Sequence, residues 1–442
     1  MLDALHKHET AARRRQLADL IGEDSIAIVA AAPQVKRNGD GHHRYRQNSD
    51  FFYLTGFNEH NAVMVVAPGR AAGEFILFCR DRDPDRERWD GVIMGVERAG
   101  EWVGADDAFP IDDIDDILPG LIEGRDKVYS ALGDDFEFDQ RLMGWVNRIR
   151  ARTRTGALPP SEFVALSTLL HEMRLLKSAH ELELMRAAAR VAVRAQTRMM
   201  QKVRPGMMEY QLGAELAYEL AYANCEEPYT SIIGGGKNAC ILHYIENNQL
   251  LHDGDMVLVD AGAEFQCYAS DITRTYPING KFTGEQKALY EVVLAANEAA
   301  IEATHAGQTF QVLNELAVKV LTEGLVDLKL LKGKVDDLIE SQAYRRFYMH
   351  SLGHWLGLDT HDVGEYKLDG QSRALAPGMV LTIEPGLYID DGVDVPEGFR
   401  NTGVRIEDNI HILPNGIENL TADCVKSVAD IEAIVGQDAD RK

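Results

Sequence analysis

The sequence has few cysteines, and their arrangement excludes two common ways of stabilising a small fold. Only five occur among 442 residues, and no two of them have Cys-x-x-Cys spacing. A scattered, odd set of this kind indicates neither a disulfide framework nor a zinc knuckle. The sequence therefore predicts reduced, mostly structural thiols at Cys79, Cys225, Cys240, Cys267 and Cys424.

Long apolar runs are also missing. Each apolar run is soon interrupted by charge and stays below the roughly 18 consecutive apolar residues that a membrane-spanning helix needs. Residues 1–20 carry His6, Lys7, Arg13 and other charges, without the apolar segment of a secretory signal peptide. We therefore expect a cytoplasmic protein with no membrane partner.

Positive charge is scarce. The chain has 46 Lys and Arg against 70 Asp and Glu, which gives a formal net charge of -24. Such a field repels nucleic acid and anionic membrane surfaces, so neither is an expected partner. It would also attract divalent cations, but many acidic proteins bind none, and charge alone decides nothing about function.

The length of the chain favours two domains over one. Short β-rich runs at residues 25–31, 62–66 and 75–78 and a helix at residues 136–150 indicate an N-terminal α/β domain. Pro159-Pro160 follows an Arg-rich stretch, and a clear helix start comes at Ser178, so we place the boundary near residue 175. The expected domains are residues 1–174 and 175–442.

Helices packed over a mostly antiparallel sheet are predicted for the second domain. Ser178 and Glu181 have capping-box spacing at the start of an amphipathic helix that should stop at Pro205. Thr283 and Gln286 form a second capping box before another long helix. Strands are expected at residues 256–260, 269–275, 379–384 and 403–407.

Acidic residues stand at or near the ends of these strands. They are Asp260, Asp271, Glu384 and Glu407. A carboxylate among apolar neighbours is costly to bury unless it is paired or bound to a metal. Taken alone, each is more often a turn or capping residue. Arg405 and Glu407 share a strand face, so a simple ion pair without metal is the alternative for them.

Three histidines lie in a short segment at His350, His354 and His361. The spacing of the first two would place them on one face of a helix, but Gly353 and Gly357 favour a loop-like path. A lone histidine is usually structural, whereas three this close together indicate a site.

Four carboxylates and one imidazole would form a hard ligand set. Such a set favours Mn²⁺ or Mg²⁺, with Co²⁺ and Zn²⁺ as alternatives, over metals that thiolates bind. Five ligands exceed what one catalytic ion with an open position needs. They fit two ions about 3.5–4 Å apart that share bridging carboxylates and a water or hydroxide.

The order of these residues resembles that of the metallopeptidase family that includes methionine aminopeptidase, prolidase and aminopeptidase P. The matching motifs are Asp260-Ala-Gly, Ser270-Asp271-Ile-Thr, His350-Ser-Leu-Gly-His354, Thr382-Ile-Glu384-Pro-Gly and Gly403-Val-Arg-Ile-Glu407. The resemblance implies the α+β pita-bread fold for the C-terminal domain. The segment from Tyr45 to Phe57 is similar to the non-catalytic N-terminal domain of the bacterial aminopeptidase P branch, a domain that methionine aminopeptidase lacks.

The resemblance implies a metal-dependent aminopeptidase that cuts peptides in which proline comes second, with two divalent ions, Mn²⁺ first. The implied metal ligands are Asp260, Asp271, His354, Glu384 and Glu407, and Glu384 would also be the base for the bridging hydroxide. The further implied site residues are His243, His350 and His361 for protons and the oxyanion, and Arg405 and Tyr388 beside the ligands.

Two departures from the family pattern, Ser351 and Thr360, affect loop geometry and not the ligands. The nearest alternative is a prolidase, which cuts only dipeptides. A metal-free creatinase or a catalytically silent binding module is disfavoured because all five ligand positions are present. The family often forms dimers or tetramers, in which Trp89 would serve a neighbour's pocket, although packing is the commoner role of a lone tryptophan.

Overall fold

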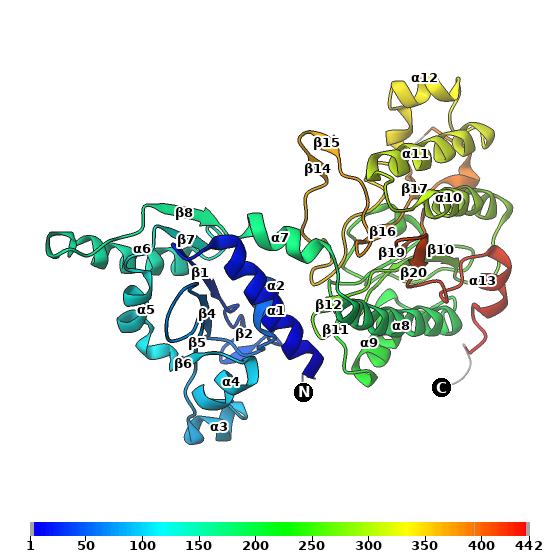
Figure 1. Cartoon of the computed structure of the whole chain (residues 1–442). Helices are drawn as coiled ribbons and strands as arrows, with labels where there is room; N and C mark the ends of the chain where they lie inside the picture. Colours follow the sequence, from blue (N-terminus) through cyan, green and yellow to red (C-terminus); the bar gives the residue numbers. More distant parts are fainter. Residues whose placement is uncertain (1–3, 393, 439–442) are drawn as a thin grey trace. The chain divides into compact units, whose positions relative to one another are not determined.

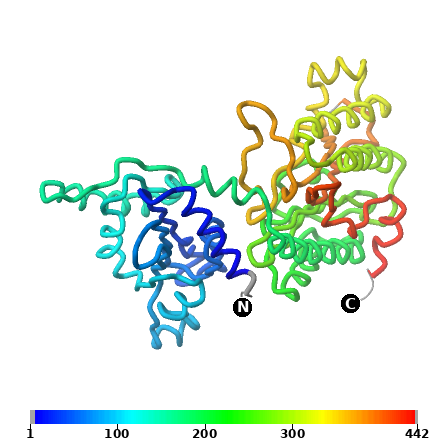
Figure 2. The backbone as a smooth tube through the Cα atoms, viewed as in Figure 1, coloured from blue at the N-terminus to red at the C-terminus, as the bar shows by residue number. Residues whose placement is uncertain are grey.

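A computed structural model describes residues 4–392 and 394–438, and the chain divides into two compact units, Met1–Arg174 and Leu175–Lys442 (Figure 1 and Figure 2). Each unit has its own hydrophobic core. Within the described residues, the helices are too short or too polar to cross a membrane.

A six-stranded mixed sheet forms the centre of the first unit, in the order β6-β5-β4-β1-β7-β8. The strands β1 and β7 pair in parallel, whereas β1 and β4 pair antiparallel. The strands are β1 (Ser25–Ala30), β4 (Val63–Val66), β5 (Phe75–Cys79), β6 (Asp107–Pro110), β7 (Lys127–Ser130) and β8 (Glu162–Ala165), with a small hairpin of β2 (Lys36–Asn38) and β3 (Gly41–His42). The predicted α/β character is confirmed.

The helices of this unit begin where the sequence supplies caps. The Asp135 side chain accepts from the backbone N–H groups of Glu137 and Phe138, which starts α6 at the predicted residue. Apolar side chains of α5 and α6 pack on the sheet around Ile28, Val65 and Trp145. The helices are α1 (Ala4–Ile21), α2 (Ser49–Thr55), α3 (Pro84–Asp90), α4 (Val96–Val103), α5 (Ile114–Ile122), α6 (Phe136–Arg150) and α7 (Ser167–Leu175).

Three small antiparallel sheets carry the second unit, in the orders β13-β10-β9, β16-β19-β20 and β17-β18. Their strands are β9 (Ile232–Gly235), β10 (Met256–Asp260), β13 (Thr273–Pro277), β16 (Val380–Ile383), β17 (Gly386–Ile389), β18 (Thr402–Arg405), β19 (Asp408–Ile412) and β20 (Ile417–Asn419). Two short hairpins join β11 (Glu264–Phe265) to β12 (Tyr268–Ala269) and β14 (Lys367–Leu368) to β15 (Gln371–Ser372). The predicted antiparallel sheet is confirmed, divided among these small sheets.

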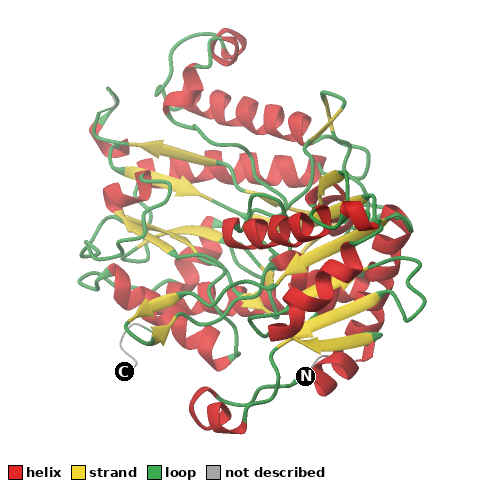
Figure 3. Ribbon diagram, turned by 90° about the vertical axis from the view of Figure 1, so that its left-hand side faces the viewer, coloured by secondary structure: helices red, strands yellow, loops and turns green. Residues whose placement is uncertain are grey.

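Long helices flank these strands (Figure 3). Both predicted capping boxes are present: Ser178 with Glu181 starts α8, and Thr283 with Gln286 starts α10. The helix α8 ends before Pro205, as predicted. The helices are α8 (Ala179–Lys202), α9 (Glu209–Tyr222), α10 (Gly284–Ala303), α11 (Phe310–Asp327), α12 (Val335–Glu340) and α13 (Val428–Ile434).

One strand prediction was wrong in a way that matters for the site. Residues 269–275 do not form one strand, because the chain leaves β12 at Ala269 and enters β13 only at Thr273. Asp271 lies in the interruption, where its backbone N–H donates to Asn409 Oδ1 and its carbonyl accepts from Asn409 Nδ2. A side-chain amide thus replaces the strand ladder at this point, and strand alternation no longer dictates where the carboxylate points.

Candidate metal centre

The five predicted ligands come from different segments of the second unit. Asp260 ends β10, Asp271 precedes β13, and His354 lies in a segment outside the described helices and strands. Glu384 lies between β16 and β17, and Glu407 lies between β18 and β19. All five line a single pocket of about 860 Å³.

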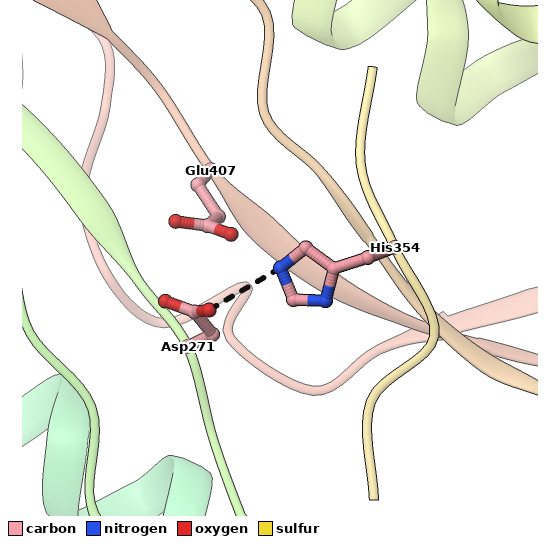
Figure 4. A group of neighbouring side chains, drawn as sticks. All are labelled: Asp271, His354 and Glu407. Carbon is pink, nitrogen blue, oxygen red and sulfur yellow. Dashed lines mark ion pairs between the residues drawn. The ribbon is translucent and has the colours of Figure 1, made fainter. Parts of the chain in front are cut away.

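Three of the predicted ligands form a compact group. Asp271, His354 and Glu407 each offer one ligand atom, and these atoms all lie within 4.8 Å of one another. His354 Nε2 is 3.5 Å from Asp271 Oδ2 and 3.5 Å from Glu384 Oε1. Figure 4 shows the imidazole and the Asp271 carboxylate pointing toward each other, with Glu407 beside them. An ion among them would meet oxygen and nitrogen ligands together.

Hydrogen bonds outside the group orient its members. His354 Nδ1 contacts the carbonyl oxygen of Trp355 at 2.9 Å, which leaves Nε2 facing the carboxylates. The Thr273 hydroxyl donates to Glu407 Oε2 at 2.7 Å. The other oxygen, Glu407 Oε1, is buried without a hydrogen-bond partner among the described residues. A buried carboxylate oxygen without a donor suits a metal ligand, because desolvation is otherwise uncompensated.

The pKa shifts of these side chains also indicate a site for a cation. Burial, reinforced by Asp271, raises the pKa of Asp260 to about 6, and burial raises the pKa of Glu384 to about 7. Burial together with the neighbouring carboxylates raises the pKa of Glu407 well above its ordinary value. Burial opposes protonation of His354, yet Asp271 and Glu384 raise the pKa of that imidazole to about 9. The pocket therefore favours positive charge at its centre, and its donor set fits divalent cations.

The other predicted histidines line the same pocket. They are His243, His350 and His361. The rings of His354 and His361 meet edge to face with centroids 4.3 Å apart. Burial lowers the pKa of His361, and His354 lowers it further.

His350 is held at both ring nitrogens. Nδ1 contacts the Ser351 carbonyl oxygen at 2.8 Å, and Nε2 contacts the Tyr388 hydroxyl at 2.8 Å. Burial, aided by Arg405, lowers the pKa of His350 to about 4, so the ring is neutral near pH 7. Because a carbonyl only accepts, the proton lies on Nδ1, and Nε2 accepts from Tyr388.

Arg405 lines the pocket, whereas Tyr388 does not. The Tyr388 hydroxyl contacts two residues that do line the pocket, Arg405 and His350. The alternative of an Arg405–Glu407 ion pair was wrong for the described structure, since Arg405 pairs with Asp260 across 2.6 Å. The reason is that β18 ends at Arg405, so Glu407 no longer follows the alternation of that strand.

Sequence reasoning missed Tyr229. Its hydroxyl is 2.6 Å from Asp260 Oδ1 and also contacts Asp271 Oδ1. Burial and the two carboxylates raise the pKa of this phenol well above its ordinary value, so it stays protonated as a donor. The residue stands in Pro228-Tyr229-Thr230, which has no strand or helix periodicity that would single it out.

Comparisons with known proteins agree with this geometry. The model of metallopeptidase family M24 matches residues 183–414, and that of the aminopeptidase P N-terminal domain matches residues 10–129. The chain is 43% identical over 436 residues to the Xaa-Pro aminopeptidase of Escherichia coli, covering 98% of this chain and 99% of that protein.

Solved structures show the same likeness in space. The Pseudomonas aeruginosa aminopeptidase PepP superposes with a TM-score of 0.96 at 56% identity, covering 97% of each chain. Zinc-substituted Escherichia coli aminopeptidase P in complex with product superposes with a TM-score of 0.95 at 43% identity, covering 99% of each chain.

Proposed function

Since this chain belongs to metallopeptidase family M24, we propose that it is an Xaa-Pro aminopeptidase, which hydrolyses the bond between an N-terminal residue and a following proline. The convergence of four carboxylates and one imidazole in one buried pocket carries the proposal. All of these residues belong to the second unit, which supports a non-catalytic role for residues 1–174.

Five residues would hold two divalent ions. Asp260 and Asp271 would bind one ion, His354 and Glu384 would bind the other, and Asp271 and Glu407 would bridge the two. When bound, the ions supply an activated water and polarise the scissile carbonyl. The hard donor set favours Mn²⁺, with Co²⁺, Zn²⁺ or Mg²⁺ as alternatives.

The chain's own residues would manage the protons. Glu384 lines the pocket among the other carboxylates, so it would take a proton from the water and later release it. His243 and His361 line the pocket, so they would donate hydrogen bonds to the carbonyl oxygen as charge develops there. His350 has its Nδ1 proton committed to Ser351, so we assign it an orienting role.

The pocket walls would provide the preference for proline. Leu242, Ile245 and Tyr366 line the pocket beside His243 and His361. Proline has no backbone N–H, so an apolar wall at its ring leaves no donor unsatisfied. Residues with a free N–H at that position would bury it without an acceptor.

We also propose a cytoplasmic location and a homo-oligomer. The described cysteines are all free thiols, which is typical of a reducing compartment. On the first unit, Trp89 and Val92 are 88% and 78% exposed, which is unusual for large apolar side chains and supports contact with another copy of the chain.

A substrate panel with Mn²⁺ tests the proposal. The release of the N-terminal residue is measured from an Xaa-Pro-Yaa tripeptide, an Xaa-Pro dipeptide and an Xaa-Ala-Yaa tripeptide, with wild type and Glu384→Ala. Cleavage of the proline tripeptide that the variant loses would support the proposal. Cleavage of the dipeptide alone would make the protein a prolidase. No cleavage with any of the four metals would favour a binding module.

A further inference from the structure

The two glutamate ligands lie at a shared interruption between two sheets. The β16–β19 ladder ends at the pair Ile383 and Asp408, and the β17–β18 ladder ends at the pair Gly386 and Arg405. Two segments of the chain therefore pass from one sheet to the other, each through two residues, at 384–385 and at 406–407. Glu384 lies in one crossing and Glu407 in the other, and one backbone hydrogen bond joins the two crossings, from the Ile406 N–H to the carbonyl oxygen of Pro385 at 3.3 Å.

A buried side chain on α10 spans this interruption. Asn297 is fully buried, and its Nδ2 donates to the carbonyl oxygen of Ile383 at 3.0 Å and to that of Ile406 at 3.2 Å. These two residues immediately precede Glu384 and Glu407. This amide group therefore ties the two crossings together beside the ligands, in addition to the backbone bond between Ile406 and Pro385.

The other end of the amide is anchored by charge. Asn297 Oδ1 accepts from Lys426 Nζ at 2.7 Å. An ammonium group only donates, so the amide oxygen faces Lys426 and the NH₂ group faces the two carbonyls. Lys426 Nζ also lies 2.7 Å from Asp408 Oδ2, and Asp408 is the residue directly after Glu407.

Arg274 completes the network from the opposite side. Its guanidinium donates to Asp408 Oδ1 at 2.8 Å and to the carbonyl oxygen of Glu407 at 2.6 Å. It also donates to the carbonyl oxygen of Thr273, whose hydroxyl holds the Glu407 carboxylate. Arg274 and Asp408 are both completely buried.

A network of this kind is expensive unless every member is satisfied, and an apolar contact between helix and sheet would be simpler. Here each of the four side chains has partners on both sides, so the arrangement is rigid. Unlike apolar packing, these hydrogen bonds fix the distance between the backbone segments that carry Glu384 and Glu407.

We propose that Asn297, anchored by Lys426 and Asp408, is a positioning residue that sets the separation of Glu384 and Glu407 and thereby the metal affinity of the site. The inference rests on the proposed function, because it takes these two glutamates as metal ligands. Asn297 does not line the pocket, and its contacts to the segments of Glu384 and Glu407 are made to the backbone.

Asn297→Asp tests this positioning role most directly. It keeps the volume and the acceptor for Lys426, and it replaces the NH₂ donor by an oxygen that faces two carbonyl oxygens. Competition between the full-length chain and a fluorescent chelator measures the affinity for Mn²⁺. Loss of such an outer contact typically weakens metal binding about 10–100-fold, and we expect a loss in this range. At saturating Mn²⁺ the KM for the tripeptide should stay near the wild-type value.

Leu325→Ala is the matched control for a general loss of stability. Leu325 is fully buried on α11, in the core of the same unit, and outside the network. It should lower the melting temperature at least as much as Asn297→Asp, with unchanged Mn²⁺ affinity. If Asn297→Asp does not fold, Lys426→Met tests the proposal instead. This variant keeps the Asn297 amide and removes the ammonium group that anchors it, so it should also weaken Mn²⁺ binding.

The outcomes separate the inference from the function on which it rests. A wild-type chain that binds no divalent cation would overturn the proposed function. Wild-type and Asn297→Asp chains that bind Mn²⁺ equally would overturn the inference alone. Equal weakening by Leu325→Ala would also overturn it, because the effect would then be one of stability.

Discussion

Arg405 holds Asp260 from a neighbouring strand, with 2.6 Å between Nη2 of the guanidinium and Oδ2 of the carboxylate. The same guanidinium donates through Nε to Thr273 and through Nη1 to the Tyr388 hydroxyl. One buried cation thus orients the carboxylate of Asp260, which we propose as a ligand, a threonine that donates to Glu407, and a tyrosine that donates to His350. A planar group with fixed donor directions can serve all three, whereas an ammonium cannot.

Arg405→Lys should therefore impair the site even though it keeps the charge. We expect kcat/KM for a proline tripeptide to fall about 10–100-fold, with weaker Mn²⁺ binding, because the fixed contacts to Thr273 and Tyr388 are lost. Steady-state kinetics at a series of Mn²⁺ concentrations measures both effects. Arg345→Lys, at an exposed position, is the control. Unchanged kinetics in Arg405→Lys would show that charge alone suffices.

Tyr229→Phe removes one hydroxyl that contacts the carboxylates of Asp260 and Asp271. The hydroxyl orients two carboxylates of the pocket, so we expect kcat/KM to fall roughly tenfold or more. Hydrogen bonds to charged groups contribute about 1.5–3 kcal/mol to stability, so the melting temperature should fall as well. Tyr222→Phe, at a position that is 81% exposed, should behave as wild type. A Tyr229→Phe enzyme with full activity would mean that the phenol does not contribute to the geometry of the carboxylates.

A buried ion pair between Lys177 and Asp362 anchors the segment that carries His354 and His361. The Nζ–Oδ2 distance is 2.9 Å, and both side chains are 1% exposed. Removing one partner of such a pair leaves the other charge buried and typically costs about 3–5 kcal/mol. Lys177→Met should therefore lower the melting temperature markedly, and the double variant Lys177→Met with Asp362→Leu should lower it less. Thermal unfolding of the wild type, Lys177→Met and the double variant checks this order, and a double variant that melts no higher than Lys177→Met would contradict it.

Only part of this site could be predicted from the sequence. The caps at Ser178 and Thr283 are local patterns, so both helix starts were predictable. The five acidic and imidazole residues could be singled out because each is unusual among its apolar neighbours. Tyr229 and Asn297 could not be found in this way, since a tyrosine near a turn and an asparagine inside a helix are locally unremarkable. Their partners come from distant strands, and only the tertiary structure brings them together.

The same reasoning explains the two wrong predictions. Strand alternation placed Arg405 and Glu407 on one face and extended a strand through Asp271. In the structure both stretches leave the regular ladder beside the pocket. Asn409 and Asn297 supply side-chain hydrogen bonds to the backbone at these interruptions, and periodicity does not reveal such contacts.

Acid should weaken one contact far from the pocket. Arg186 donates to both oxygens of Glu418, and this contact lowers the pKa of Glu418 to about 2. His411 faces the same carboxylate at 3.0 Å. A folded pKa below the unfolded value gives stability that is present above about pH 4 and is lost as the pH falls toward 2.

Glu418→Gln should therefore lower the melting temperature slightly at pH 6 and converge with wild type at low pH. A partly exposed pair contributes at most about 1 kcal/mol, so the difference at pH 6 should be small. Melting temperatures of the two proteins from pH 6 downward test this sign. A gap that widens on acidification would refute the assignment.

We propose that five residues of the second unit hold two divalent ions on which hydrolysis depends. Elemental analysis of the chain after chelation and stepwise return of Mn²⁺, with activity toward a proline tripeptide followed in parallel, measures this dependence. We expect activity to disappear on chelation, to return with Mn²⁺ and to saturate near two ions per chain, and we expect Glu407→Ala to lower the amount of bound metal. Full activity in the metal-depleted chain, or undiminished metal in Glu407→Ala, would contradict it.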